Sequence, residues 1–285
     1  MSDASALASG KGHRDENFPV ASVVIAPRHR PAVLAFYNFV RIADDVADSA
    51  VAPPEEKLRL LEDMRLSLMG AADVSPEGVR LRTVLAERRL ATDHAADLLE
   101  AFRRDVTKLR YADWDELIDY CRYSAMPVGR YMLDVHGESR DGWAANDALC
   151  AALQVINHLQ DCGKDYREID RVYLPDDILK KHGATVEMLG EARARPALKA
   201  ALHEVASRNG ELLRQSAVFA GRIRDKRLAF DVAVIQRFAE DLNTRLLAAD
   251  PLSERVHHTK AELLPLVVSA FGRFLSSRFA AKSSP

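Results

Sequence analysis

The chain has 285 residues, of which 48% are hydrophobic and 29% are charged. Its 40 basic and 42 acidic residues leave a net charge of −2, which argues against a nucleic-acid-binding surface. Three dispersed cysteines, Cys121, Cys150 and Cys162, fit reduced thiols in a cytoplasmic protein rather than a disulfide framework or a zinc pattern. The N-terminus is polar, without the apolar core of a signal peptide, and no apolar run approaches the roughly 20 residues that span a membrane.

Helical periodicity dominates the chain, and no run alternates with the period of a strand. Residues 1–12 are small and polar and are expected to form a disordered tail. Residues 13–285 are expected to form one all-α domain. After a first helix that contains Asp44, the predicted helices are 56–69, one starting near residue 76, 95–106, 114–135, 143–166, 185–193, 196–219, 226–249 and 260–279, with an extended segment at 171–175.

The predicted helix 114–135 is unusual in its middle, where small residues are followed by Pro127 and Gly129. A proline inside a helix removes a hydrogen bond, so we expect a kink there. Tyr120, Tyr123 and Tyr131 lie on either side of it. This pattern is compatible with a tight helix crossing and equally with a gap left for a ligand that faces the phenol rings.

The segment 153–175 contains a regular series of polar side chains. Asn157, Asp161 and Asp165 recur every four residues, and at about 100° per residue they and Gln154 lie on one helix face. Stacked carboxylates repel each other and are costly to desolvate. A hard divalent cation removes both problems, and oxygen ligands of this kind suit Mg²⁺ held jointly with substrate phosphates. A solvated acidic face is the alternative interpretation.

A second acidic face lies near the start of the chain. Tyr37, Arg41, Asp44 and Asp48 fall within roughly 60° of one another on a helix whose flanking positions are apolar. Two such helices facing each other would form a carboxylate cage for several Mg²⁺ ions, with Arg41 free to take a phosphate oxygen. Together the two faces predict diphosphate chemistry.

Other metal patterns are weak. A single Glu-x-x-His occurs at Glu254 and His257, whereas a di-iron bundle needs two of them, and no Gly-rich phosphate loop is present. His158 follows Asn157 but points about 100° away on the helix, so we expect it to pack or to support the site rather than to bind a metal.

Three motifs in a fixed order carry a family resemblance. They are Arg41-x-x-Asp44-Asp45-x-x-Asp48, then Tyr120-Cys121-x-x-x-Ala125-x-x-Val128-Gly129, and then Asn157-x-x-Gln160-Asp161-x-x-x-Asp165 leading to Arg171-x-Tyr173-Leu174-Pro175. From about residue 10 to about residue 252 the chain resembles the squalene/phytoene synthases, which join prenyl diphosphates head to head. The resemblance implies a single-domain isoprenoid synthase (class I terpenoid synthase-like) helical bundle with a central cavity.

The resemblance also implies roles for individual residues. Asp44, Asp48, Asp161 and Asp165 would hold Mg²⁺ and serve catalysis, with Asn157 completing the second metal site. Tyr120 would face the reacting carbons. The implied substrate-binding residues are Tyr37, Arg41, Arg171 and Tyr173 at the diphosphate end and Ser124, Val128, Leu153 and Gln154 along the prenyl chain.

The chain departs from the family pattern at two places. The family often has a Gly-Gly pair before a late arginine, but residues 238–245 lack it, which puts a phosphate role for Arg245 in doubt. Lys164 lies between the two aspartates of the second motif and should make that site less acidic.

The leader at 10–22 resembles the branch of the family used in bacterial hopanoid synthesis. This branch implies conversion of presqualene diphosphate and water into hydroxysqualene and diphosphate, without a redox cofactor. The alternative within the family is condensation of two prenyl diphosphates, such as farnesyl diphosphate, to presqualene diphosphate, squalene or phytoene. A non-enzymatic helical scaffold, with structural acidic faces, is a third alternative.

The last predicted helix is rich in large apolar residues and contains Arg273 near its middle, with Arg278 and Lys282 beyond it. It is expected either to pack on the bundle or to lie at a membrane surface, where basic residues are attracted to anionic lipid. Because a thirty-carbon product is poorly soluble in water, the second alternative implies peripheral contact with the inner face of the membrane.

Overall fold

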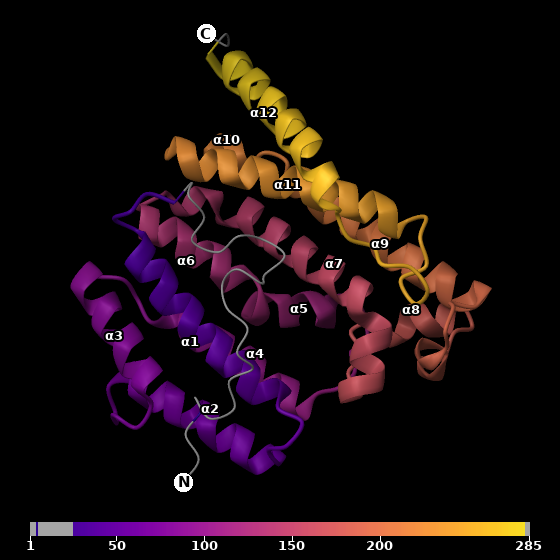
Figure 1. Ribbon diagram of the computed structural model, residues 1–285, viewed down its shortest axis with the longest axis horizontal. Coiled ribbons are helices and arrows are strands. Elements are labelled where there is room, and N and C mark those ends of the chain that lie inside the picture. Colours follow the sequence, from indigo (N-terminus) through magenta and orange to yellow (C-terminus); the bar gives the residue numbers. More distant parts are fainter. Residues whose placement is uncertain (1–3, 5–24, 283–285) are drawn as a thin grey trace. The chain divides into compact units, whose positions relative to one another are not determined.

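The computed structural model describes Ala4 and residues 25–282, with side chains described up to residue 275. Every regular element in this part of the chain is a helix (Figure 1), which confirms the all-α prediction. Apart from Ala4, the expected tail at 1–12 and the leader at 10–22 lie outside the described residues. None of the described helices is long and apolar enough to cross a membrane.

The chain divides into two compact units. Unit 1 consists of Met1–Lys108 and Pro127–Gly137, and unit 2 consists of Leu109–Met126 and Glu138–Pro285. The prediction that residues 13–285 form one domain stays a prediction.

Unit 1 is a cluster of helices around an apolar core. Its helices are α1 (Arg30–Asp48), α2 (Pro54–Met69), α3 (Pro76–Arg88), α4 (Asp93–Thr107) and, from Pro127 onward, α6 (Met126–His136). A proline in the first turn starts α1, α2 and α3, where its missing N–H leaves no helical hydrogen bond unmade. The ring of Tyr131 stacks on Phe36 at 3.9 Å, and its hydroxyl donates to the carbonyl of Ala32 at 2.9 Å. These contacts fix α6 against α1.

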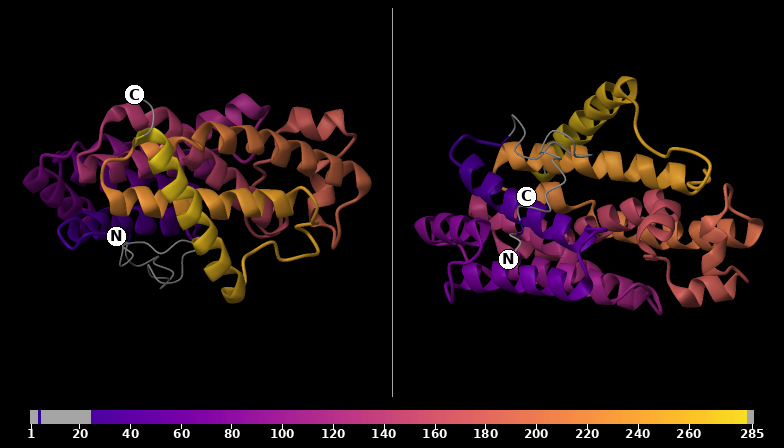
Figure 2. Two further views of the ribbon diagram at one scale, coloured as in Figure 1. Left: turned by 90° about the horizontal axis from the view of Figure 1, so that it is seen from above. Right: turned by 60° about the horizontal axis from the view of Figure 1, so that its bottom comes forward.

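Unit 2 is built around the long helix α7. Its elements are α5 (Trp114–Ser124), η2 (Arg140–Gly142), α7 (Trp143–Ile169), α8 (Asp176–Lys181), η3 (Val186–Gly190), α9 (Pro196–Ser216), α10 (Phe219–Arg222), α11 (Lys226–Leu246) and α12 (Lys260–Lys282). Helix α7 packs against α9 and α11, and α12 crosses α11 (Figure 2). Asn209 donates to the Ala152 carbonyl at 3.3 Å and to Asn243 at 3.0 Å, so one buried side chain links α7, α9 and α11.

The structure corrects three details of the sequence interpretation. The predicted helix 114–135 is two helices, because the backbone leaves helical geometry at Ala125 (φ −128°, ψ −48°) and Pro127 lies in the first turn of the next helix. The segment 185–193 contains only the short 3₁₀ helix η3. Leu189 is the single buried residue of η3, so the segment has no buried face on which a longer helix would pack. Helix α8 was not predicted, because six residues are too few to display a helical period.

Gly163 lies on α7 between the two aspartates of the second acidic motif, and it permits a close contact on the side of the helix away from them. A Cβ atom at this position would lie 2.6 Å from Cδ2 of Leu252 and 3.3 Å from the carbonyl oxygen of Leu189. One turn earlier on α7, the side chain of Gln160 donates to the carbonyl of Val256. The segment between α11 and α12 is therefore held against α7.

We predict that Gly163→Ala lowers the free energy of unfolding by about 1–2 kcal/mol, because the added methyl group overpacks this contact. Urea unfolding of the full chain measures the change. Gly221→Ala is the matched control, since a Cβ there meets nothing within 4 Å. Because the nearest atom belongs to a side chain, Leu252→Ala in the same chain should recover most of the loss, and a loss that Leu252→Ala leaves unchanged would contradict the clash.

Candidate active site

The acidic face of α1 lies in unit 1. Ala43, Val46 and Ala47 are buried in the core and fix the rotation of the helix. The opposite side presents Asp44, whose side chain is 38% exposed, and Asp48, which is exposed one turn later. The predicted stacking of carboxylates on one face of this helix is therefore present.

Asp44 is in an electrostatically crowded position. Burial of its carboxyl group among protein atoms, with repulsion from Asp48, Asp45 and Asp105, raises its pKa to about 7, while Arg41 acts in the opposite direction. Asp105 belongs to α4 and is almost completely buried, so the negative charge at this face comes from two helices. A site with this excess of carboxylates favours a bound cation.

The sequence analysis expected Arg41 to be free to bind a phosphate oxygen, but in the structure its guanidinium is already paired. Its guanidinium donates to Asp44 at 3.1 Å and to Asp45 at 2.6 Å. Asp45 is nearly buried, with 6% of its side chain exposed, and its ion pair with Arg41 is the shorter of the two. The arginine therefore neutralises part of the carboxylate cluster.

The second acidic face lies on α7 in unit 2. Gln154, Asn157 and Asp165 are half-buried and Asp161 is exposed, as expected for one open face, while the helix buries its other side. The amine of Lys164 lies 4.0 Å from Glu168, one turn further along. Lys164 is thus paired along the helix, although its charge remains next to the aspartates.

The segment after α7 is anchored by backbone hydrogen bonds. Asp170 adopts a left-handed conformation (φ 52°) that ends the helix, and the Arg171 N–H donates to the carbonyl of Asp165 at 3.1 Å. Beyond this turn, the N–H groups of Val172 and Asp176 donate to the carbonyls of Leu109 and Tyr111, both at 2.9 Å. The predicted extended segment 171–175 is therefore held beside residues 109–112.

Four aromatic side chains form a buried cluster in unit 2. The ring of Tyr173 stacks on His158 at 3.5 Å and on Tyr111 at 5.5 Å, and Tyr120 lies 5.4 Å from Tyr173. Nη1 of Arg171 donates to the Tyr173 hydroxyl at 3.4 Å. Burial, reinforced by the positive charge of Arg171, lowers the pKa of His158 to about 3, so its imidazole is neutral. Two predicted site residues, Tyr120 and Tyr173, are thus brought together.

The remaining predicted residues fall in different environments. Oγ of Ser124 is buried in unit 2 and has no hydrogen-bond partner among the described residues, whereas Val128 in unit 1 is 41% exposed. Leu153 is half-buried. Arg245 pairs with Asp241 and Glu262, both at 2.7 Å, which supports the doubt about a phosphate role.

The sequence analysis expected His158 to pack or to support the site, and its stacking on Tyr173 agrees with packing, whereas Asp105 and Tyr111 were missed. Asp105 carried one usable signal, because an aspartate on the apolar face of a predicted helix is costly to bury without a function. Tyr111 carried none, since its contacts with Tyr120 and Tyr173 join parts of the chain far apart in sequence.

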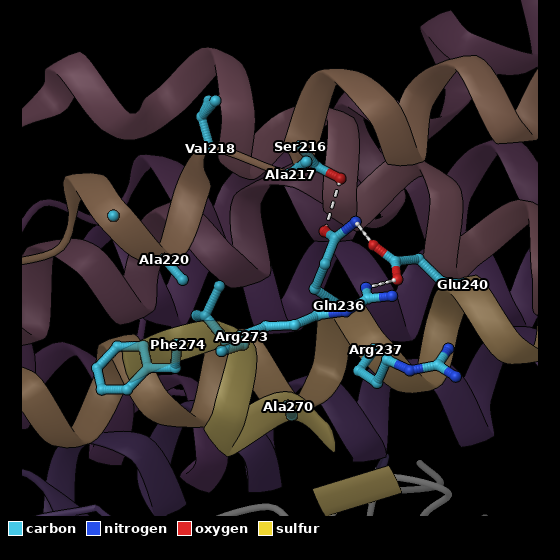
Figure 3. A pocket seen from close by; sticks show the side chains of 13 residues that line it. Ser216, Ala217, Val218, Ala220, Gln236, Arg237, Glu240, Ala270, Arg273 and Phe274 are labelled. Atoms are coloured by element: carbon cyan, nitrogen blue, oxygen red, sulfur yellow. Dashed lines mark hydrogen bonds and ion pairs between the residues drawn. The ribbon is translucent and has the colours of Figure 1, made fainter. Parts of the chain in front are cut away.

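A pocket of about 460 Å³ lies elsewhere in unit 2, between the end of α9, α10, α11 and α12 (Figure 3). Its wall is largely apolar and includes Val232, Ala270 and Phe274. Gln236 lies between its polar groups, accepting from Ser216 at 2.8 Å and donating to Glu240 at 3.1 Å (Figure 3).

Comparison with known proteins agrees with these features. Residues 12–262 match the squalene/phytoene synthase family. The chain belongs to this family. A protein of Zymomonas mobilis named hydroxysqualene synthase is 56% identical over 277 residues, covering 96% of this chain and 93% of the relative. A protein of Rhodopseudomonas palustris with the same name is 55% identical over 276 residues, covering 97% and 94%.

The fold also matches solved structures of this family. The crystal structure of a squalene synthase from Alicyclobacillus acidocaldarius superposes with a TM-score of 0.71 at 30% identity, covering 86% of this chain and 90% of that one. The isoprenoid synthase helical fold that the motifs implied is therefore confirmed.

The raised pKa of Asp44 predicts how the stability of the metal-free protein depends on pH. Between the ordinary carboxyl pKa of 3.8 and about 7, the folded state binds more protons than the unfolded state, so this group lowers stability as the pH rises. Asp44→Asn should therefore gain about 1 kcal/mol over the wild type at pH 8, an amount reduced by solvent screening of the partly exposed side chain.

Urea unfolding with a chelator, at pH 8 and at pH 4.5, measures this gain. The difference between variant and wild type should shrink at pH 4.5, where the wild-type carboxyl is largely protonated in the folded state. Glu87→Gln makes the same charge change at an exposed position of α3 and should show no such pH dependence. An Asp44→Asn variant that is less stable than the wild type at pH 8 would contradict the crowding of carboxylates.

Proposed function

We propose that this chain converts presqualene diphosphate and water into hydroxysqualene and diphosphate in squalene and hopanoid synthesis. The observation that carries the proposal is the identity of 55–56% to relatives named hydroxysqualene synthase, over nearly the full length of both chains. Members of this family act on prenyl diphosphates and typically use a divalent metal ion.

The proposed metal is Mg²⁺, and the residues present fit it. Asp44 and Asp48 on α1, and Asn157, Asp161 and Asp165 on α7, offer hard oxygen donors. The raised pKa of Asp44 supports this fit, because carboxylates that resist joint ionisation gain from a cation. When bound, the metal would supply charge neutralisation to the diphosphate leaving group.

In this proposal the residues of the chain divide into a diphosphate end and an apolar end. Arg171 keeps its charge although it is buried, and with Tyr173 it would bind diphosphate oxygens. Tyr37 and Arg41 would contribute from α1, and Arg41 would exchange Asp44 for the substrate. The residues assigned to the apolar chain are Ser124, Val128, Leu153 and Gln154.

Departure of diphosphate leaves an allylic or cyclopropylcarbinyl cation on the thirty-carbon chain. Tyr120 is almost fully buried, and its ring face would stabilise this charge in surroundings poor in water. Addition of water is neutral in redox terms, so NADPH is not required for the proposed product.

A second candidate keeps the fold and the metal ligands but condenses two prenyl diphosphates. It is favoured by the likeness to a protein titled squalene synthase, at 30% identity. The proteins that match are named as enzymes, which leaves the interpretation as a non-enzymatic scaffold without support.

Incubation of the purified protein with presqualene diphosphate and Mg²⁺, with and without NADPH, tests the proposal. We expect hydroxysqualene in both reactions, identified by mass spectrometry. Asp161→Asn should reduce turnover by orders of magnitude while its helical circular dichroism is retained, because it removes a charged metal ligand from an exposed position. Turnover of farnesyl diphosphate alone would favour the second candidate, and unchanged turnover in Asp161→Asn would contradict the metal assignment.

The proposed location is cytoplasmic, with peripheral contact to the inner face of the membrane through α12. The ring of Phe274 packs on Phe230 at 6.0 Å, and Leu266 and Ala270 are buried, so one face of α12 belongs to unit 2. The other face exposes large apolar side chains at helical spacing: Leu264 (71%), Val268 (62%), Phe271 (48%) and Leu275 (39%). Arg278 and Lys282 lie beyond the residues whose side chains are described.

This exposed stripe supports an interfacial helix, since an apolar face with basic neighbours suits the surface of an anionic bilayer. The apolar pocket between α11 and α12 lies next to the same helix. A poorly soluble product would pass from such a surface into lipid rather than into water.

We predict weak, salt-sensitive binding of the full chain to vesicles that contain anionic lipid. Leu264→Ser combined with Val268→Ser should weaken it at least tenfold, because both side chains are exposed and no core contact is lost. Val74→Ser removes a valine of unit 1 that is 56% exposed and serves as the control. Co-sedimentation measures binding, and a double variant that still binds like the wild type rules out this contact.

A further inference from the structure

His158 occupies an unusual position on α7, directly after the proposed metal ligand Asn157. Its side chain is 8% exposed and points into the aromatic cluster of unit 2. The imidazole lies almost parallel to the ring of Tyr173, at 3.5 Å and 14°, and 6.1 Å from the ring of Tyr120. A polar ring thus lies in the same aromatic cluster as Tyr120, the residue assigned to the reacting carbons.

One nitrogen of this ring is not satisfied by the described residues. Nε2 of His158 is buried and has no hydrogen-bond partner among the described residues. A buried nitrogen left in this state costs about 1–3 kcal/mol, and such atoms in native proteins are usually matched by an ordered water or a ligand. The nitrogens of an imidazole form hydrogen bonds with water, and a water molecule is the smallest partner that could satisfy this one.

Packing alone does not account for a histidine here. A phenylalanine or leucine would fill the space beside Tyr173 with the same apolar contact and would leave no nitrogen to satisfy. The nitrogen is therefore the feature that needs a function, and the proposed reaction has one polar reactant besides the diphosphate, which is water.

We propose that His158 positions, by a hydrogen bond, the water molecule that captures the cation, and thereby directs the reaction to the alcohol. This inference rests on the proposed function and deepens it. His158 is a positioning residue: it holds the oxygen of the water toward the cation and is unchanged at the end of the reaction.

The atoms and charges of the step balance without a further reactant. The carbon–oxygen bond to diphosphate breaks, and the electron pair leaves with the diphosphate. The cyclopropane ring of the resulting cation rearranges and opens, which breaks one of its carbon–carbon bonds and places the positive charge on an allylic carbon. A lone pair of the water oxygen then forms the new carbon–oxygen bond at that carbon, and one water proton passes to an oxygen of the released diphosphate. If no water molecule is held beside it, the cation instead loses a proton from a neighbouring carbon. The product is then a hydrocarbon with one more double bond than the alcohol.

The test compares two substitutions of His158 in the full-length enzyme. His158→Phe keeps an aromatic ring beside Tyr173 but removes both nitrogens, whereas His158→Gln keeps a hydrogen-bonding group that does not titrate. Presqualene diphosphate is supplied with Mg²⁺ in ¹⁸O-labelled water. The ratio of labelled alcohol to unlabelled hydrocarbon and the rate of diphosphate release are measured, and His203→Leu, at an exposed histidine of α9, is the control.

We expect His158→Phe to lower the ratio of alcohol to hydrocarbon at least tenfold while diphosphate release falls less, and His158→Gln to retain the alcohol as the main product. A purely structural role would slow all products together and leave this ratio unchanged. If His158→Phe does not fold, His158→Leu replaces it.

Two outcomes overturn the inference: alcohol as the main product of the Phe or Leu variant, or equal loss of alcohol in the Gln variant. A wild-type enzyme that makes no alcohol from presqualene diphosphate contradicts the proposed function itself, and is thereby distinguished from a failure of His158 alone.

Discussion

The carboxyl group of Asp44 is held where its charge is unfavourable, and much of the arrangement in unit 1 depends on this constraint. Burial of Ala43, Val46 and Ala47 sets the rotation of α1, so the aspartate cannot turn away from its acidic neighbours without unpacking the core. Its raised pKa, about 7, reflects the free-energy cost of ionising this carboxyl group among its neighbours. Arg41 offsets part of this cost, and any cation that binds the same carboxylate oxygen competes with that arginine.

Helix α7 is under a related constraint, because one of its sides is buried while the other carries the acidic residues. The buried side is close-packed, and at Gly163 it approaches Leu252 so closely that a methyl group does not fit. The open side carries Asp161 and Asp165 at spacing that requires an undistorted helix. The turn at Asp170, where the N–H of Arg171 donates to the carbonyl of Asp165, therefore joins the end of the acidic face to the segment that carries Arg171 and Tyr173.

The sequence predicted the features that repeat along the chain. Helical periodicity located most helices, and the four-residue spacing of aspartates located both acidic faces, because these signals need only local geometry. It did not predict the ion pair of Arg41 with buried Asp45, although both residues lie on one helix, because burial depends on the packing of other helices. The end of α5 at Ser124 was missed for a similar reason, since Pro127 is compatible with either a kink or a new helix.

The aromatic cluster of unit 2 shows why a change of a few side-chain atoms can alter the product of a reaction while the fold stays the same. Tyr111, Tyr120 and Tyr173 contribute ring faces, which favour a cation and do not hold water at a fixed point. Among the described residues of that unit, Oγ of Ser124 and Nε2 of His158 are buried polar atoms without hydrogen-bond partners. In the proposed reaction, a water molecule beside this cluster would be held at such an atom. The fate of a cation beside it then depends on whether a nitrogen or a methyl group occupies one position, while the helices and the metal ligands stay the same.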